Sequence, residues 1–308
     1  MIDCVYIAAS KLDARFTRTC VASVRYFHGD IPIRLLVGGR LQPRVAHELR
    51  RYWGVQIADV PKGNHGWGFI KLEPLFGPRG ERFLVLDSDT VMTGRVLELA
   101  DSHDEDLIVD NSKVSLELAK AIYYDGDKAA EEGSPIPSPA FLFNTGQWFG
   151  RSGVLTREHF GELVEWGCPP RVRNPQIFKN GEQGIFNFVA NEQLRLGRIS
   201  VARVPLMHWA GRGTKELDAR RVLGRAAAPL VIHWAGMKMV RQRGMIGADL
   251  LSSFEEIYYQ RLPVRRGRRI LANCENSLTH WVDGVLVRGR LFLQKVSKRW
   301  RPRLRLQS

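Results

Sequence analysis

Two aspartates that follow a short apolar run are the clearest candidates for chemistry in this sequence of 308 residues. Residues 83–86 read Phe-Leu-Val-Leu, and Asp87 and Asp89 come directly after them, separated by Ser88. Four consecutive apolar residues are typical of a strand that is buried on both faces of a parallel sheet. Residues i and i+2 of an extended chain point the same way, so the carboxylates would converge where open α/β sheets bind ligands. Convergent carboxylates suit a hard divalent cation; the competing interpretation is a solvated turn.

A histidine late in the chain is a candidate third ligand for that cation. The tetrapeptide His-Trp-Ala-Gly occurs twice, beginning at His208 and at His233, each time after an apolar run. An imidazole beside carboxylates shifts the preference of a site from magnesium toward manganese. We expect His233 to be the ligand because it lies nearer to the end of the domain, with His208 as the alternative. Gly236 would then let the backbone approach a diphosphate closely, and Lys238 would pair with it. The competing interpretation is that His233 is a core residue.

The elements that must position these residues alternate between strand and helix. Apolar runs of strand length and apolar residues at helical spacing follow one another from the first residues onward. That alternation is typical of βαβ units and a parallel sheet. We expect strands over residues 4–9, 33–37, 55–57, 83–86, 106–110, 201–208 and 229–233. We expect helices over residues 15–27, 44–52 and 155–166 (with Thr156 as N-cap), a short helix that opens at residues 180–183, and a last helix that begins at a capping box over residues 253–256.

The basic charge of the protein is concentrated at its carboxyl end. From Arg261 onward there are 13 Lys or Arg and two acidic residues, so this segment carries +11 of the total net charge of +14. We therefore expect an α/β domain over residues 1–262 and a basic, amphipathic helical tail over residues 263–308. Basic residues mixed with large apolar ones are typical of a segment that lies on an anionic membrane surface, and the alternative is a solvated tail. The charge would also suit nucleic acid, but no nucleic-acid module is recognisable, so we expect no specific nucleic-acid partner.

The composition favours an intracellular location. No apolar run approaches the roughly 20 residues needed to cross a membrane, and the first residues lack the pattern of a secretory signal. The four cysteines are scattered without a C-x-x-C pair, which indicates reduced thiols and no zinc site. We expect a cytoplasmic protein, held on the inner face of the membrane if the tail binds lipid.

Several motifs taken together resemble those of a known family. In chain order they are Ala8-Ala9-Ser10, Lys71, Asp87-Ser88-Asp89, Asn144-Thr145-Gly146, Glu182-Gln183 and His233 with Gly236 and Lys238. This order is similar to that of the nucleotide-sugar glycosyltransferases with the GT-A fold. The resemblance is closest to retaining family eight, the type of glycogenin and of the lipopolysaccharide galactosyltransferases, and it covers about residues 1–260.

The resemblance implies a fold and an activity. The fold would be a Rossmann-like α/β domain with a central, mostly parallel sheet. The activity would be the metal-dependent transfer of a hexose, with retention, from a nucleotide diphosphate sugar to a glycan or lipid-linked acceptor. The donor would be a UDP-sugar, and the metal Mn²⁺ or Mg²⁺.

The resemblance also implies roles for individual residues. Asp87, Asp89 and His233 would hold the metal, with Ser88 between the carboxylates. The catalytic candidates are Gln183, which would lie under the anomeric carbon, together with Glu182 and Asn144. The remaining donor-binding candidates are Ala8, Ala9 and Ser10 along the nucleoside, Lys71 near the phosphates or sugar, Gly146 beside the sugar, and Gly236 and Lys238 over the diphosphate.

The sequence departs from the family pattern in three ways, one of which is the duplicate His-Trp-Ala-Gly motif at His208, which leaves open which histidine binds the metal. Glu182 stands where the family usually has Asp, and Lys238 comes one position early with no Pro after it. One alternative function is a sugar-phosphate nucleotidyltransferase, but residues 9–13 lack the Gly-rich loop that such enzymes carry after the first strand. The other alternative is a non-catalytic protein that binds sugar nucleotides or polyanions.

Overall fold

The first part of the chain builds a parallel sheet from alternating strands and helices. The computed structural model describes all residues except 39, 40, 62, 64, 67, 134, 135, 212–217, 237–243 and 300–308. The first elements are β1 (Cys4–Ala9), η1 (Lys11–Asp13), α1 (Ala14–Phe27), β2 (Ile33–Val37), α2 (Pro43–Trp53), β3 (Val55–Ile57), η2 (Phe69–Phe76) and β4 (Arg82–Asp87). These bounds agree with the expected strands and helices, because the local apolar pattern of each element is strong.

The central sheet has seven strands in the order β10-β6-β7-β4-β1-β2-β3. The strands that extend it beyond β4 are β7 (Gln147–Arg151), β6 (Leu107–Asp110) and β10 (Val201–Val204). β7 is antiparallel to both of its neighbours, whereas the other neighbouring strands are parallel. The expected α/β architecture with a mostly parallel sheet is confirmed. Because Ala8 pairs with Asp87 and Leu86 pairs with Gln147, the ends of β1 and β4 meet the start of β7 at one edge.

A smaller sheet brings a distant segment to that same edge. It consists of β5 (Thr90–Met92), β12 (Val231–His233) and β11 (Met207–Trp209), with β12 in the middle. β12 is antiparallel to β5 and pairs His233 with Thr90, the residue that follows Asp89. β11 is parallel to β12 and pairs Trp209 with His233. The two copies of the His-Trp-Ala-Gly motif therefore lie side by side.

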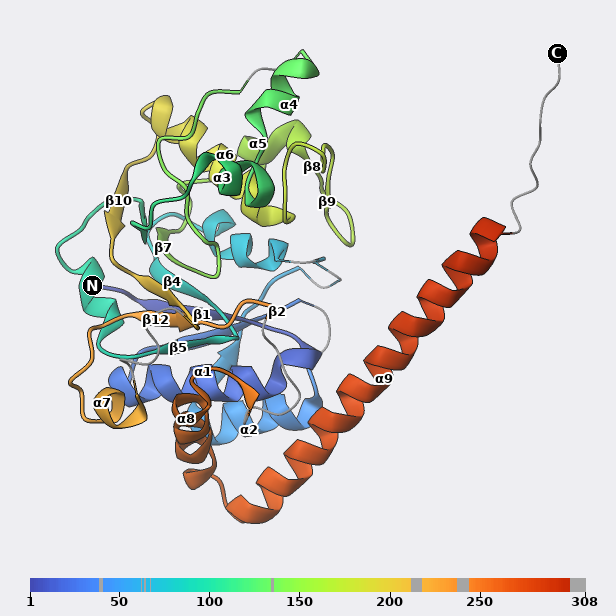
Figure 1. Ribbon diagram of the computed structural model, residues 1–308. Helices are drawn as coiled ribbons and strands as arrows, with labels where there is room; N and C mark the ends of the chain where they lie inside the picture. Colours follow the sequence, from blue (N-terminus) through green and yellow to red (C-terminus); the bar gives the residue numbers. More distant parts are fainter. Residues whose placement is uncertain are drawn as a thin grey trace.

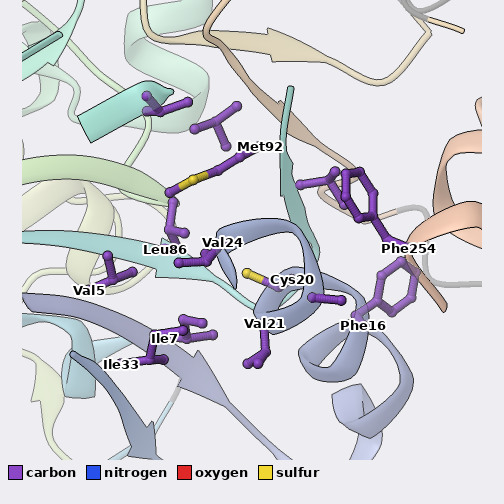
Figure 2. Packing of buried hydrophobic residues seen from close by; sticks show 14 of the residues in the cluster. Val5, Ile7, Phe16, Cys20, Val21, Val24, Ile33, Leu86, Met92 and Phe254 are labelled. Atoms are coloured by element: carbon purple, nitrogen blue, oxygen red, sulfur yellow. The ribbon is translucent and has the colours of Figure 1, made fainter. Parts of the chain in front are cut away.

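Both faces of the central sheet are buried. Leu84 and Leu86 belong to one apolar cluster and Phe83 and Val85 to another, as expected for a strand in the middle of a sheet. Helices α1, α2 and α8 (Ala248–Gln260) cover the first face, and α6 (Glu182–Arg195) lies on the second (Figure 1). In the first cluster β1, β2 and β4 pack on α1 through Val5, Ile7, Ile33, Leu86, Cys20, Val21 and Val24 (Figure 2).

The predicted helix over residues 155–166 is wrong beyond its first turn. The structure has α5 (Arg157–Phe160), then η4 (Gly161–Leu163), then β8 (Val164–Glu165), which pairs with β9 (Arg171–Val172). Gly161 ends the helix with a φ of 33°, and the pairing with β9 supplies the next backbone bonds. The expected start at Thr156 does hold, because its backbone N–H donates to His159 Nδ1 at 3.0 Å.

The predicted capping box at residues 253–256 is also wrong. Helix α8 already begins at Ala248, after Gly247 in a left-handed conformation with a φ of 69°. Ser253 lies within the helix, and its hydroxyl donates to the carbonyl oxygen of Asp249 at 2.9 Å. The remaining elements are η3 (Val96–Ala100), α3 (Leu116–Ile122), α4 (Gly126–Glu131) and α7 (Ala219–Leu223).

The carboxyl-terminal segment forms a long helix, α9 (Arg265–Arg299), which leads away from the rest of the protein (Figure 1). Ion pairs to α2 and α8 hold its first turns. Arg268 Nη1 lies 3.3 Å from Glu48 Oε1 of α2, and Arg269 Nη2 lies 2.9 Å from Glu255 Oε2 of α8. Of the described helices, none is long and apolar enough to span a bilayer. The division into a domain over residues 1–262 and a tail over 263–308 stays a prediction.

Candidate active site

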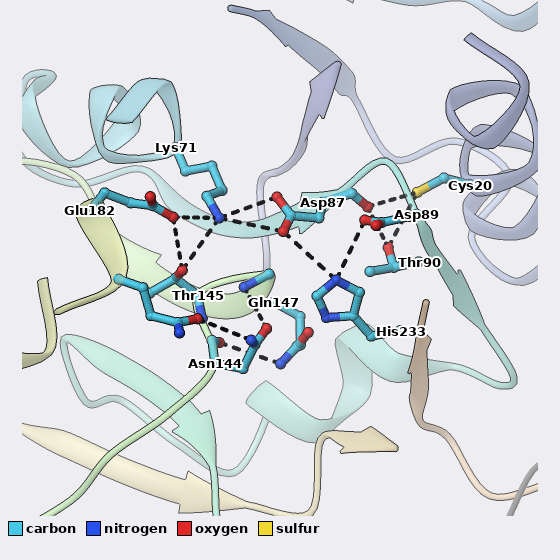
Figure 3. Close-up of polar contacts among 12 residues, drawn as sticks. Cys20, Lys71, Asp87, Asp89, Thr90, Asn144, Thr145, Gln147, Glu182 and His233 are labelled. Atoms are coloured by element: carbon cyan, nitrogen blue, oxygen red, sulfur yellow. Dashed lines mark hydrogen bonds and ion pairs between the residues drawn. The ribbon is translucent and has the colours of Figure 1, made fainter. Parts of the chain in front are cut away.

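Three potential metal ligands converge where β4, β5 and β12 meet. His233 Nε2 lies 3.4 Å from Asp89 Oδ1 and 3.8 Å from Asp87 Oδ2 (Figure 3). One ligand atom from each of the three residues lies within 4.8 Å of the other two. The chain brings them together because Asp87 and Asp89 flank the end of β4, while the pairing of β12 with β5 carries His233 alongside. His208 is exposed and is not part of this group.

The chemistry of this group fits a divalent cation. Asp89 and His233 are almost fully buried, whereas the Asp87 side chain is 26% exposed and opens toward solvent. Two carboxylates at this separation repel each other unless a positive charge lies between them. Carboxylate oxygens suit Mg²⁺ and Mn²⁺, and the imidazole nitrogen favours Mn²⁺ of the two.

Lys71 lies at the centre of a buried ionic network beside these ligands. Its Nζ is 2.7 Å from Glu182 Oε1, 3.3 Å from Asp87 Oδ1 and 3.3 Å from Thr145 Oγ1. Burial by itself would lower the pKa of Lys71, but the carboxylates of Asp87 and Glu182 outweigh it and raise the pKa above its ordinary value. We therefore expect Lys71 to stay protonated at neutral pH. It holds Asp87 and Glu182 at a fixed separation.

Glu182 is accommodated by a glycine on the facing loop. Glu182 is the first residue of α6, and Thr145 Oγ1 donates to its Oε1 at 3.0 Å. Gly68 faces it with a φ of 87°, and a Cβ at Gly68 would lie 1.9 Å from Glu182 Oε2. A larger residue at 68 would therefore expel the carboxylate. Gly68 was not among the predicted site residues, although it lies at the end of a Gly-rich loop.

Gln183 and Asn144 form a second polar pair, across from the metal ligands. The Gln183 Oε1 atom accepts from Asn144 Nδ2 at 3.0 Å and from the Thr145 backbone N–H at 3.4 Å. Asn144 Oδ1 in turn accepts from the Gly146 N–H at 2.8 Å. These bonds fix the orientation of both amides. Gly146 backs His233 so closely that a Cβ there would lie 2.3 Å from His233 Cε1.

A single cleft of about 840 Å³ contains nearly all of the predicted site residues. Those that line it are Ala8, Ala9, Ser10, Lys71, Asp87, Ser88, Asp89, Asn144, Glu182, Gln183, His233 and Gly236. Gly146 is absent from this lining because it packs behind His233. Lys238 lies outside the described residues.

Trp209 is a site residue that the sequence analysis missed. Its indole stacks on the His233 imidazole with ring centroids 5.3 Å apart and an interplanar angle of 19°. The repeated His-Trp-Ala-Gly motif was the available signal. From the sequence alone its two histidines are competing ligands, whereas the parallel pairing of β11 with β12 places Trp209 of the first copy against His233 of the second.

Solved structures match this fold, although no family model and no curated protein matches the sequence. The galactosyltransferase LgtC, in complex with donor and acceptor sugar analogs, matches with a TM-score of 0.56 and 16% identity over 85% of this chain and 97% of LgtC. The bifunctional glycosyltransferase WbbM matches with a TM-score of 0.55 and 16% identity, over 84% of this chain and 51% of WbbM. The glycosyltransferase GlyE of Streptococcus pneumoniae matches with a TM-score of 0.52 and 14% identity, over 84% of this chain and 63% of GlyE. The expected GT-A fold is confirmed by these matches.

Proposed function

We propose that this protein is a metal-dependent glycosyltransferase. It would move a hexose from a nucleotide diphosphate sugar, a UDP-sugar, to a glycan or lipid-linked acceptor with retention. The observation that carries the proposal is the convergence of Asp87, Asp89 and His233 within 4.8 Å of one another, in the same cleft as the Asn144 and Gln183 amides. The GT-A fold supports it, because ligands of open α/β sheets bind at this edge.

The donor diphosphate would lie beside the metal ligands. Asp87, Asp89 and His233 would hold Mn²⁺ or Mg²⁺, which when bound neutralises negative charge on the leaving diphosphate. The nucleoside would lie along Ala8, Ala9 and Ser10 at the end of β1, the strand next to β4. Ser88 and the backbone at Gly236, whose φ is 73°, line the same cleft and are candidates for phosphate contacts. Lys238 is a further candidate.

The donor sugar would lie between the metal ligands and α6. Gln183 Oε1 is oriented by Asn144 and by the Thr145 backbone, and the partial negative charge of this oxygen can stabilise positive charge that develops on the anomeric carbon. Glu182 is bound by Lys71 and Thr145, which suits it to orient the sugar hydroxyls. With retention, the acceptor hydroxyl attacks the face from which the diphosphate leaves. The new bond forms between that oxygen and the anomeric carbon, and the departing phosphate takes the proton.

The acceptor would enter past the far wall of the cleft. That wall carries partly exposed apolar side chains, among them Val114 and, one helical turn apart on α3, Leu118 and Ile122. Such a wall supports an acceptor with an apolar portion, as in a lipid-linked glycan. Comparing octyl glycosides with methyl glycosides of the same sugars measures this preference.

The tail would bring the enzyme to a membrane that carries such acceptors, on the cytoplasmic side. The described part of α9 exposes Ile270, Leu271, Leu278 and Trp281 among its basic residues. That composition suits an anionic membrane surface. Sedimentation with anionic liposomes, compared with retention on RNA at the same salt concentration, tests the proposal. Equal binding to both would reduce it to general polyanion affinity.

A donor panel with and without Mn²⁺ is the experiment that tests the activity. We expect slow hydrolysis of one UDP-sugar when no acceptor is present, and loss of this hydrolysis in Asp89→Asn. Asp104→Asn is the matched control, because that aspartate is almost fully exposed and distant from the cleft. Hydrolysis that is unaffected by Asp89→Asn would refute the metal assignment.

The two alternatives give different results in the same assays. A nucleotidyltransferase would release pyrophosphate from a nucleoside triphosphate and a sugar 1-phosphate. The segment between β1 and α1 argues against it, because residues 9–13 contain no glycine. A non-catalytic protein would bind the nucleotide sugar in a Mn²⁺-dependent manner and leave it intact with every acceptor.

A further inference from the structure

Two buried polar atoms near the candidate metal ligands have no hydrogen-bond partner among the described residues. They are Nδ1 of His233 and Oε1 of Gln147. The His233 side chain is 2% exposed and Gln147 is fully buried. A buried polar atom without a partner is rare, because the lost hydrogen bond to water is not replaced. Two of them in one place require an explanation.

The two side chains come from segments that pack directly on each other. Gln147 is the first residue of β7 and pairs with Leu86, the residue before Asp87. Its neighbour Gly146 touches the imidazole, since a Cβ at Gly146 would lie 2.8 Å from His233 Nδ1. Figure 3 shows the Gln147 amide on the side of the imidazole that is away from the two carboxylates.

The orientation of the Gln147 amide is set by a third residue. Its Nε2 donates to the backbone carbonyl oxygen of Asn144 at 3.4 Å. The Gln147 amide oxygen is then the group that is left to accept a hydrogen bond from the imidazole. The two unpartnered atoms are therefore complementary, because a neutral imidazole whose Nε2 is free for a cation carries its proton on Nδ1.

We propose that Gln147 is a positioning residue for His233. Its amide oxygen accepts the Nδ1 proton of His233 and so fixes the tautomer that presents Nε2 to Asp87, Asp89 and the cation. Metal-binding histidines usually donate their other ring N–H to such an acceptor, and loss of the acceptor typically weakens metal binding by about 10–100-fold. The proposal rests on the metal binding in the proposed function, and it adds the residue that orients one ligand.

An amide suits this position better than a carboxylate for an electrostatic reason. The cleft already gathers the carboxylates of Asp87, Asp89 and Glu182 near the ammonium group of Lys71. A further carboxylate at position 147 would add repulsion in the metal-free protein, whereas an amide oxygen accepts the proton without adding charge. Gln147 also contacts Asn144, which bonds to Gln183, so the histidine and the amide proposed to face the anomeric carbon belong to one connected set.

The first test is made on the metal-free protein. NMR of protein labelled with ¹⁵N-histidine reports which ring nitrogen of His233 carries the proton, with His233→Ala used for assignment. We expect a slowly exchanging Nδ1–H in the wild-type protein and in Gln147→Glu, and its loss in Gln147→Leu. A wild-type imidazole that is protonated at Nε2 alone, or an unchanged Nδ1–H signal in Gln147→Leu, would overturn the proposal.

The second test measures Mn²⁺ dissociation constants by electron paramagnetic resonance. Gln147→Leu should weaken binding by about 10–100-fold, whereas Gln147→Glu, which keeps an acceptor, should bind at least as tightly as the wild type. Gln193→Leu is the matched control, since Gln193 is also buried but lies on α6 away from the cleft. Equal weakening in both Gln147 variants would mean a packing defect and would overturn the proposal. A wild-type protein that binds no Mn²⁺ would refute the proposed function instead, and the NMR result would still decide the role of Gln147.

Discussion

We expect Gly146→Ala, which adds one methyl group, to displace His233 from the candidate metal site. A Cβ at this position would lie 2.3 Å from His233 Cε1 and 2.7 Å from Asn144 Oδ1. Ordinary contact begins near 3.4 Å, so in Gly146→Ala the imidazole must retreat by about 1.1 Å. Metal–ligand distances tolerate only about 0.2 Å. Trp209 stacks on the ring and restricts the movements that could restore the geometry.

The expected effect on cation binding is therefore the loss of one ligand of three. We expect the Mn²⁺ affinity to fall by about 100-fold, the upper end of the range for losing a partner that orients a metal-binding histidine, which corresponds to about 2.8 kcal/mol of binding free energy. Overpacking should also lower the free energy of unfolding by about 1–3 kcal/mol. The affinity of Gly146→Ala should equal that of His233→Ala.

Titration of Mn²⁺ followed by electron paramagnetic resonance measures the effect, and far-ultraviolet circular dichroism confirms that the variant is folded. Gly38→Ala is the control. Gly38 lines the same cleft, but the nearest atom to a Cβ there is Ile70 Cγ2 at 3.6 Å, an ordinary contact. A folded Gly146→Ala protein that binds Mn²⁺ within about 2-fold of the wild type would refute the role of His233.

Three further predictions concern stability. Lys71→Met leaves Glu182 and Asp87 without their cation and should lower the free energy of unfolding by about 3–5 kcal/mol, measured by urea titration. The double variant Lys71→Met/Glu182→Gln should recover part of this loss. Glu48 is fully buried against Arg18 and Arg268, so Glu48→Ala should lower the free energy of unfolding by a similar amount. It should also speed amide hydrogen exchange in the first turns of α9, and unchanged exchange there would contradict the anchoring of α9. Burial, and then the charge of Arg95, lower the pKa of His28 from 6.5 to about 4. The unfolded state therefore takes up the proton first, and the free energy of unfolding should fall as the pH drops from about 6.5 to about 4. His28→Gln should reduce that fall by about 2–3 kcal/mol, measured as the change in urea midpoints between pH 7.5 and pH 4.5, and an equal fall in both proteins would exclude His28 as its cause.

The parts of the site that are local in sequence were predictable. The buried strand before Asp87 is encoded by four apolar residues in a row, and the alternating strands and helices of the first 57 residues follow from apolar periodicity. The same holds for the opening of α6 at Glu182. These features depend on neighbours in the chain, so a single sequence contains the information.

The parts that depend on pairing between distant strands were not predictable from spacing. Nothing near Trp209 indicates that β11 lies parallel to β12, and nothing near Gln147 indicates that β7 is inserted between β4 and β6. The helix predicted over residues 155–166 fails for the same reason, because the pairing of β8 with β9 overrides its helical spacing. The partners of Lys71 are equally non-local.

The central sheet consists of two blocks joined by a single strand. β10 and β6 form one block and β4, β1, β2 and β3 form the other, and in the described part of the sheet only β7 is bonded to both. Asn144, Gly146 and Gln147 lie at the start of β7 or just before it, so part of the candidate site lies at the strand that joins the two blocks. A shift of β7 by one residue would turn Gln147 to the opposite face of the sheet. We therefore expect a substitution that weakens the pairing of β7 to weaken cation binding in the cleft as well.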